Sequence, residues 1–190
     1  MNEKKFKILR IVPFPIYPPN DGGSMYVFYI SKALAEEGHK IDFVVIDNPN
    51  NEINAPEPDI KENENYFGNI IYIKPKNKIR TLFSFQPYRN IRNKPDNKEI
   101  RQIKKIIYQE KYDFVFFDGA FSYPYWKAII SDLKNLNAKC IYIAHNVDYI
   151  DILNRSKDSQ NPLLKLFYWF DHLKLKNLEK KYIQNFKYIL

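Results

Sequence analysis

The sequence contains very few of the residues that usually build disulfides and metal sites. Among its 190 residues there are one Cys and three His. A single thiol, Cys140, cannot form an intrachain disulfide, and three scattered histidines give no recognisable metal-ligand spacing. The sequence therefore predicts neither a disulfide scaffold nor a metal centre.

Long apolar runs are missing as well. No stretch approaches the ~20 apolar residues of a membrane-spanning helix. Arg10 and several prolines interrupt the apolar segment that follows the N-terminal lysines, so no signal peptide is predicted. Together with the lone cysteine, these absences lead us to expect a cytoplasmic protein.

Several common catalytic and nucleotide-binding motifs are also absent. The sequence has only 5 Gly, and it contains no G-x-G-x-x-G fingerprint, no P-loop and no G-x-S-x-G elbow. It does have 45% hydrophobic and 16% aromatic residues, which is enough for one packed core. We therefore expect one domain that belongs to none of these motif-defined classes.

Short apolar segments alternate with amphipathic ones along the chain. The first kind predicts strands at residues 7–12, 41–46, 70–73, 113–117, 140–144 and 186–190. The second kind predicts helices at 24–37, from Asp96 onward, at 121–136 and from Asn161-Pro162 to about Ile183. For the first helix we expect a common face of Tyr26, Ile30, Ala33 and Leu34. For the last helix we expect a buried stripe that includes Leu163, Phe167, Phe170 and Leu173.

This alternation predicts an α/β fold, with a Rossmann-like, mostly parallel sheet and helices on both faces. Ligands of such sheets bind beyond the carboxyl ends of the strands. Three segments fall at that edge: 13–23, 118–121 and 145–148. We therefore expect the functional residues to gather there.

Two features at this edge are candidates for ligand binding. Gly22 and Gly23 precede the first helix, where glycines let a ligand approach the backbone and the helix N-terminus offers free N–H groups to an anion; an ordinary turn is the alternative. His145 follows a strand, and a histidine at a strand's carboxyl end can donate to or accept from a ligand hydroxyl. We expect His39, at the opposite edge, to be structural, and His172 to be a solvated surface residue.

A basic segment runs from Lys74 to Lys105. It carries eleven Lys or Arg and two acids, so the net charge of this segment alone exceeds the +8 of the whole chain. Such a patch suits nucleic acid, anionic lipid or an anionic glycan, and it also suits a solvated surface. Because no RRM, KH or helix-turn-helix signature accompanies it, we expect no nucleic-acid partner; we expect an anionic membrane surface.

Several stretches, taken in order, resemble the N-terminal domain of the family 4 glycosyltransferases, which have the GT-B fold. These stretches are Asp21-Gly22-Gly23 before a helix, Glu37-Gly38-His39-Lys40-Ile41, Tyr112-Asp113 before a strand ending at Asp118, His145-Asn146-Val147-Asp148, and the exit from Glu179-Lys180-Lys181 to Leu190. Relatives often have H-N-x-E in the fourth stretch, and here Asp148 replaces the Glu. The resemblance covers essentially the whole chain.

The resemblance implies that residues 1–190 form the acceptor-side N-terminal domain and that the donor-binding C-terminal domain lies outside this chain. It implies a retaining glycosyltransferase of the hexosyltransferase type that takes an NDP-sugar and needs no metal or other cofactor. The acceptor would be a glycan or a lipid-linked molecule. The enzyme would act in cell-surface polysaccharide or glycolipid synthesis, at the inner face of the membrane. A non-catalytic carbohydrate- or nucleotide-binding module on the same fold is the alternative.

Site roles follow from the same resemblance. His145 would be catalytic and contact the donor sugar. Gly22 and Gly23 would line the donor phosphates and the acceptor entrance. Asp118 and Gly119 would border the acceptor pocket, and Asn146 would join the binding residues. We expect the isolated chain to be inactive, because one wall of the interdomain cleft is missing.

Overall fold

The computed structural model describes residues 4–46, 66–73, 86–92 and 94–190. Within these residues, six strands form one sheet in the order β3-β2-β1-β4-β5-β6, and every adjacent pair is parallel. The strands are β1 (Lys7–Val12), β2 (Lys40–Ile46), β3 (Ile70–Ile73), β4 (Phe114–Asp118), β5 (Lys139–Ile143) and β6 (Tyr188–Ile189). The predicted Rossmann-like α/β fold is confirmed.

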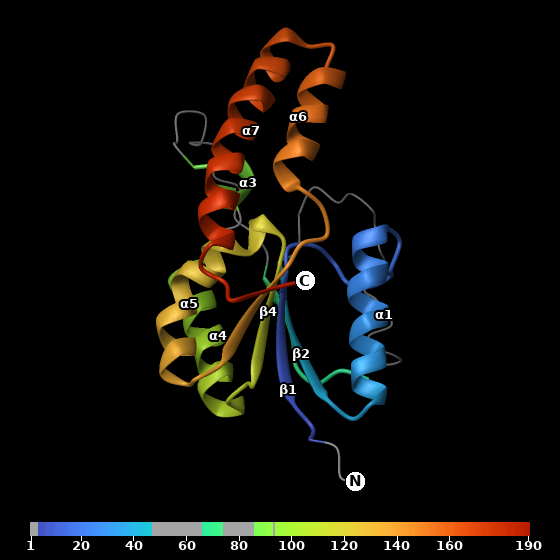
Figure 1. Cartoon of the computed structure of the whole chain (residues 1–190), viewed down its shortest axis with the longest axis vertical. Helices are drawn as coiled ribbons and strands as arrows, with labels where there is room; N and C mark the ends of the chain where they lie inside the picture. Colours follow the sequence, from blue (N-terminus) through green and yellow to red (C-terminus); the bar gives the residue numbers. More distant parts are fainter. Residues whose placement is uncertain (1–3, 47–65, 74–85, 93) are drawn as a thin grey trace.

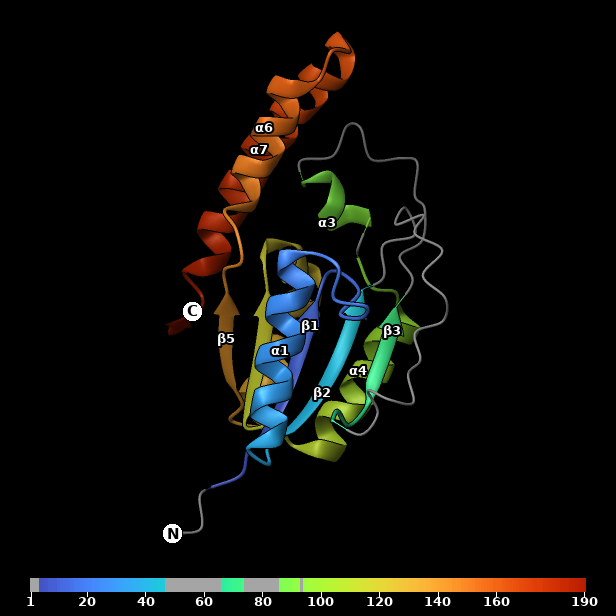
Figure 2. The same cartoon turned by 90° about the vertical axis from the view of Figure 1, so that its right-hand side faces the viewer.

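Helices cover both faces of this sheet (Figures 1 and 2). Helix α1 (Gly22–Glu36) lies on one face, and α4 (Asn97–Glu110) and α5 (Tyr123–Asn135) lie on the other. The remaining helical elements are α3 (Tyr88–Arg92), the short 3-10 helix η1 (Ala120–Ser122), α6 (Asp148–Asp158) and α7 (Pro162–Ile183). Helices α6 and α7 form a hairpin that projects beyond the carboxyl edge of the sheet (Figure 2).

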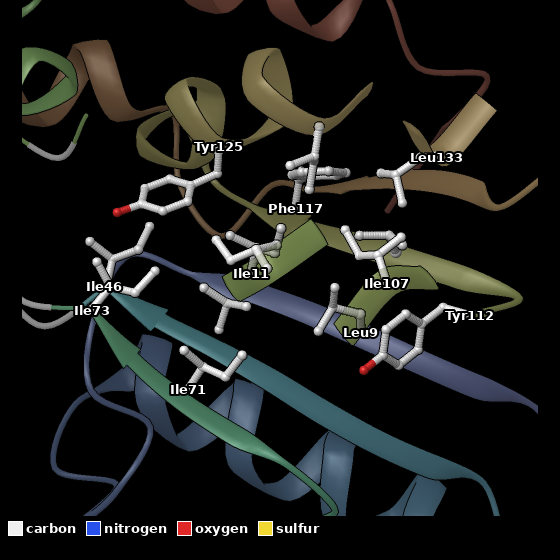
Figure 3. Packing of buried hydrophobic residues seen from close by; sticks show 14 of the residues in the cluster. Leu9, Ile11, Ile46, Ile71, Ile73, Ile107, Tyr112, Phe117, Tyr125 and Leu133 are labelled. Carbon is white, nitrogen blue, oxygen red and sulfur yellow. The ribbon is translucent and has the colours of Figure 1, made fainter. Parts of the chain in front are cut away.

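The strands are apolar on both faces because each face carries helices. In β1, Leu9 and Ile11 join the core beneath α4 and α5, which Figure 3 shows, while Ile8 and Val12 join the core beneath α1. Because successive side chains of a strand point to opposite faces, the side chains of β1 are shared between the two cores. Arg10 also points to the α1 side and is the one charged residue of β1 beyond Lys7.

Local signals fix the helix starts. Asp96 and Glu99 form the predicted capping box at α4, and Asn161 accepts hydrogen bonds from the first-turn amides of α7, where Pro162 is the first residue. A second capping box, between Asp21 and Ser24, begins α1 two residues earlier than predicted. Gly22 and Gly23 therefore belong to the first turn of the helix.

Three predictions about helices were wrong or incomplete. Helix α1 buries the face that contains Ser24, Val27, Phe28 and Ser31, whereas Tyr26 and Ile30 are exposed. The predicted stripe of α7 is largely exposed, and its buried residues are Asp171, His172, Leu175, Glu179 and Tyr182. The sequence analysis did not predict α3 or α6.

His172 is buried and not, as expected, a solvated residue. Burial lowers the pKa of its imidazole, and the nearby Lys176 charge lowers it further. His39 behaves as predicted, because its Nδ1 accepts a hydrogen bond from the Phe6 amide at the amino edge of the sheet. The basic segment from Lys74 to Lys105 lies partly outside the described residues, and its role stays a prediction.

Candidate active site

A buried ion pair lies at the carboxyl end of β4. The Arg10 guanidinium donates from Nη2 to Oδ1 of Asp118 at 2.5 Å and from Nε to Oδ2 at 3.2 Å. The Arg10 side chain is 1% exposed and that of Asp118 is 0% exposed. Arg10 Nη1 also donates to Ser31 Oγ and to the Val27 carbonyl oxygen, so α1 holds the guanidinium from the other side.

The ion pair keeps Asp118 ionised. Burial by itself raises the pKa of this carboxyl, but the Arg10 charge and the hydrogen bonds from His145 and Arg10 outweigh burial and lower the pKa below its ordinary value. Because Arg10 neutralises the carboxylate, a buried acid can serve here as a fixed hydrogen-bond acceptor. Such a pair is costly to desolvate, so both charged groups need hydrogen-bond partners, and both have them here.

The Asp118 carboxylate is the hydrogen-bond acceptor for His145. The Nε2 atom of His145 lies 2.6 Å from Asp118 Oδ1, and the imidazole is 13% exposed. An ionised carboxylate at this distance favours the tautomer with the proton on Nε2, which leaves Nδ1 as the acceptor nitrogen. Within the described residues, Nδ1 has no hydrogen-bond partner. His145 is thus oriented by the protein, and its second nitrogen stays available.

Two aromatic rings hold the imidazole in place. Phe14, from the loop after β1, and Tyr26, from α1, both pack edge-on against His145, with ring centroids 5.7 and 5.1 Å away. The edge-on contacts leave the ring little freedom to turn. They also explain why Tyr26 faces away from the core beneath α1.

The N-terminus of α1 lies in the same cluster. A Cβ added to Gly23 would lie 3.4 Å from Cζ of Phe14, the ring that packs on His145. Asp21 accepts from the Ser24 amide, and the amides of Gly22 and Gly23 have no acceptor among the described residues. Both predicted glycines therefore leave free N–H groups at the N-terminus of α1, where an anion is favoured, and Phe14 lies between Gly23 and His145. Neither glycine has a φ in the left-handed region.

Gly119 adopts such a left-handed conformation, with φ +68°. The next amide, that of Ala120, donates to Asp148 Oδ2 at 2.8 Å, and a Cβ on Gly119 would lie 3.1 Å from that oxygen. Asp148 is the first residue of α6. The residue that replaces the usual Glu therefore ties the loop after β4 to the start of the hairpin.

A buried acid on α7 faces this junction. Burial, together with repulsion from Asp148, raises the pKa of Glu179 to about 7, although the Tyr142 hydroxyl donates a hydrogen bond to Glu179 Oε1 and lowers it. Glu179 thus changes charge near neutral pH. Its carboxyl group also interacts with the backbone of Asp148 and Tyr149 at the start of α6.

The structure brings most of the predicted site residues together. His145, Asp118 and Gly119 are in one group, and Gly22 and Gly23 adjoin it through Phe14. Asn146 follows His145 and is exposed. Asp118 is covered by its two partners, so any effect of its carboxylate on a ligand passes through His145.

Arg10 was not predicted as a site residue. The available signal was a lone charge inside a strand that is otherwise apolar on both faces, because a buried charge requires a partner. An acidic residue at the end of a neighbouring strand, Asp118, was the natural partner. From the sequence, Arg10 was interpreted only as an interruption of an apolar run.

The described residues contain no group of three or more His, Cys, Asp or Glu arranged to hold a metal ion. Among the described helices, none is long and apolar enough to cross a membrane.

A parallel sheet with an oriented histidine and a helix N-terminus at its carboxyl edge defines a Rossmann-like ligand-binding domain. The chain belongs to glycosyltransferase family 4, because the model of Glycosyltransferase Family 4 matches residues 20–188. The family predicted from the sequence is therefore confirmed.

Two solved structures of Arabidopsis thaliana UGT89C1 are similar to this chain. The one complexed with UDP-L-rhamnose has 11% sequence identity and a TM-score of 0.40, over 94% of this chain and 40% of that one. The one complexed with UDP has 13% identity and a TM-score of 0.36, over 83% and 38%. No curated protein matches the chain closely enough to count as a relative. The chain thus spans about two fifths of the length of these structures.

Proposed function

We propose that this chain is the acceptor-side N-terminal domain of a retaining glycosyltransferase of the hexosyltransferase type. The enzyme transfers a sugar from an NDP-sugar to a glycan or lipid-linked acceptor, in cell-surface polysaccharide or glycolipid synthesis. A second, C-terminal domain holds most of the donor. The observation that carries this proposal is the Asp118-oriented imidazole of His145 beside the α1 N-terminus, in a chain of family 4.

The geometry suits the chemistry of such a donor. The free amides of Gly22 and Gly23 stabilise negative charge on a nearby phosphate. His145 Nδ1 accepts a hydrogen bond from a sugar hydroxyl and so positions the reacting carbon. Asp118 acts as a positioning residue, since it fixes the tautomer and the ring orientation of His145. We propose that the enzyme works without a metal, with basic side chains of the second domain completing the phosphate site.

The test compares variants of the full-length enzyme. We expect His145→Ala to lower kcat by ~10²-fold or more, the effect of one lost transition-state contact. Asp118→Asn should lower kcat less and alter the pH profile, because the amide no longer fixes the tautomer. His39→Ala, at the opposite edge, is the matched histidine control and should keep wild-type turnover.

Unchanged turnover in His145→Ala would contradict the role of this residue. If the full-length protein binds an NDP-sugar but transfers it to no acceptor, the non-catalytic binding module becomes the better explanation. Treatment with a chelator checks the metal independence, and a loss of activity that Mg²⁺ or Mn²⁺ restores would contradict it.

A further inference from the structure

The first half of α7 presents a row of large apolar side chains to solvent. They recur at intervals of three, four and three residues, so they share one face of the helix: Leu163, Leu166, Phe170 and Leu173, with Trp169 beside them. Leu163 is 80% exposed. The row is roughly 15 Å long at 1.5 Å per residue.

The row is not the face by which α7 packs within the domain. Leu175 and Tyr182 are the buried apolar residues of α7. Leu175 packs with Ile152 of α6, and Tyr182 packs in the core beneath α4 and α5. Soluble monomers seldom expose contiguous apolar rows of this kind, and such rows mark interaction surfaces. The hairpin that carries the row projects away from the sheet (Figure 2), and every side chain of the row is exposed.

The charges of α7 are also divided between two faces. Both of its acids are buried: Asp171 accepts from the Tyr88 amide, and Glu179 accepts from the Tyr142 hydroxyl. Its basic residues, by contrast, are exposed or half-buried, namely Lys165, Lys174, Lys176, Lys180 and Lys181. The accessible charges of α7 are therefore all basic, and its apolar row lies in the half toward the tip of the hairpin.

We propose that α7 docks on an anionic lipid surface, with the apolar row at the boundary between headgroups and acyl chains and the lysines at the phosphates. Exposed Leu, Phe and Trp combined with lysines are what an interfacial helix requires. A second copy of this chain would bring basic helix against basic helix. A nucleic acid would leave the aliphatic side chains without apolar partners. This docking goes beyond the transfer reaction and does not depend on it.

The test uses the 190-residue chain and vesicles of phosphatidylcholine, with or without phosphatidylglycerol. We expect sedimentation with the anionic vesicles, weakening as salt rises because exposed charges are screened. Leu166→Gln/Phe170→Gln should bind at least about ten-fold more weakly, as expected when two large apolar side chains no longer enter the interface. The fluorescence of Trp169 should shift to the blue on binding, a shift that Trp169→Phe removes.

Two further variants complete the design. Tyr29→Gln/Ile30→Gln removes exposed apolar side chains from α1 and should bind like the wild type. Replacement of Lys174, Lys176, Lys180 and Lys181 by Gln should weaken binding to anionic vesicles. Because these side chains are at least partly exposed, the fold should be retained, and far-UV circular dichroism should be unchanged in all variants.

Equal binding to neutral and anionic vesicles would overturn the proposal. So would binding that the α7 substitutions leave unchanged. A dimer in analytical ultracentrifugation that Leu166→Gln/Phe170→Gln dissociates, without vesicle binding, would assign the row to a second copy. No sugar donor or acceptor is present in these measurements, so their failure leaves the proposed transfer reaction untouched.

Discussion

Replacement of Arg10 by methionine should strongly destabilise the fold. The substitution keeps an unbranched apolar chain in the same space but removes both hydrogen bonds to Asp118 and the counterion of a carboxylate that is 0% exposed. Loss of one partner of a buried pair costs about 3–5 kcal/mol. For a domain of this size, that cost lowers Tm by roughly 6–20 °C.

The pH dependence of stability should change in a defined direction. In the wild type the pKa of Asp118 is lowered on folding, so its contribution is present above the unfolded-state pKa of ~3.9 and is lost as pH falls through the folded-state value. In Arg10→Met, burial dominates and raises the folded-state pKa above the unfolded-state one. The folded state then binds the proton more tightly, and acid stabilises the variant. The free energies of unfolding of the wild type and of Arg10→Met should therefore become more similar as the pH falls from 7 to about 4.5.

Urea unfolding of the 190-residue chain at both pH values measures these free energies. The double variant Arg10→Met/Asp118→Leu is the control, because it removes the stranded charge together with its partner. It should recover much of the lost free energy of unfolding. A single variant within about 1 kcal/mol of the wild type at pH 7, or a difference that widens in acid, would refute the reasoning.

Three further predictions concern the glycines and the domain as a whole. Gly119→Ala should cost about 1–3 kcal/mol of stability, because φ is +68° and the new Cβ lies 3.1 Å from Asp148 Oδ2; thermal unfolding that matches the wild type would contradict this. Gly23→Val should lower turnover of the full-length enzyme for both substrates, since its methyl groups press on Phe14, whereas Gly22→Ala meets open space and should leave stability unchanged. Kinetics equal to the wild type would reduce Gly23 to a capping position. The chain alone should unfold cooperatively on heating but transfer no sugar, and robust transfer by the purified chain would disprove the two-domain proposal.

The strands and the helix starts were predictable because their signals are local. The apolar run 70–73 is β3 with unchanged bounds, and the Asp96–Glu99 pair and Asn161-Pro162 begin α4 and α7 as expected. A parallel sheet buried on both faces requires continuous apolar strands, and such strands are visible without knowledge of their neighbours. Helix α6 lacks a side-chain cap, which is why its start was not recognised.

The buried faces of the helices were less predictable because tertiary partners decide them. In α1, the small side chains of Ser24 and Ser31 face the sheet, where Ser31 accepts a hydrogen bond from Arg10. A hydrophobic pattern selects Tyr26 and Ile30 instead. In α7, two acids and a histidine lie on the packed face, while Leu163, Leu166 and Leu173 lie outside it, so a stripe chosen by hydrophobicity alone falls on the exposed side.

His145 was predictable from topology, since the end of a parallel strand is where ligands bind. Its control by Asp118 was not predictable, because the two residues are 27 positions apart and meet only when β4 and β5 pair. The third member, Arg10, is 108 positions from Asp118 and comes from the central strand β1. Strand order therefore assembles the site, and no local motif encodes it.

The buried ion pair of Arg10 and Asp118 is costly to desolvate, so stability alone does not account for it. Apolar side chains of similar volume at positions 10 and 118 would stabilise the domain at least as well, because desolvation of two charges offsets most of their attraction. The pair instead gives His145 an ionised acceptor 2.6 Å from Nε2. Arg10→Met/Asp118→Leu should therefore separate the two effects in the full-length enzyme. Its stability should approach that of the wild type, while its turnover should fall toward that of His145→Ala; wild-type turnover in this variant would mean that the pair only stabilises the fold.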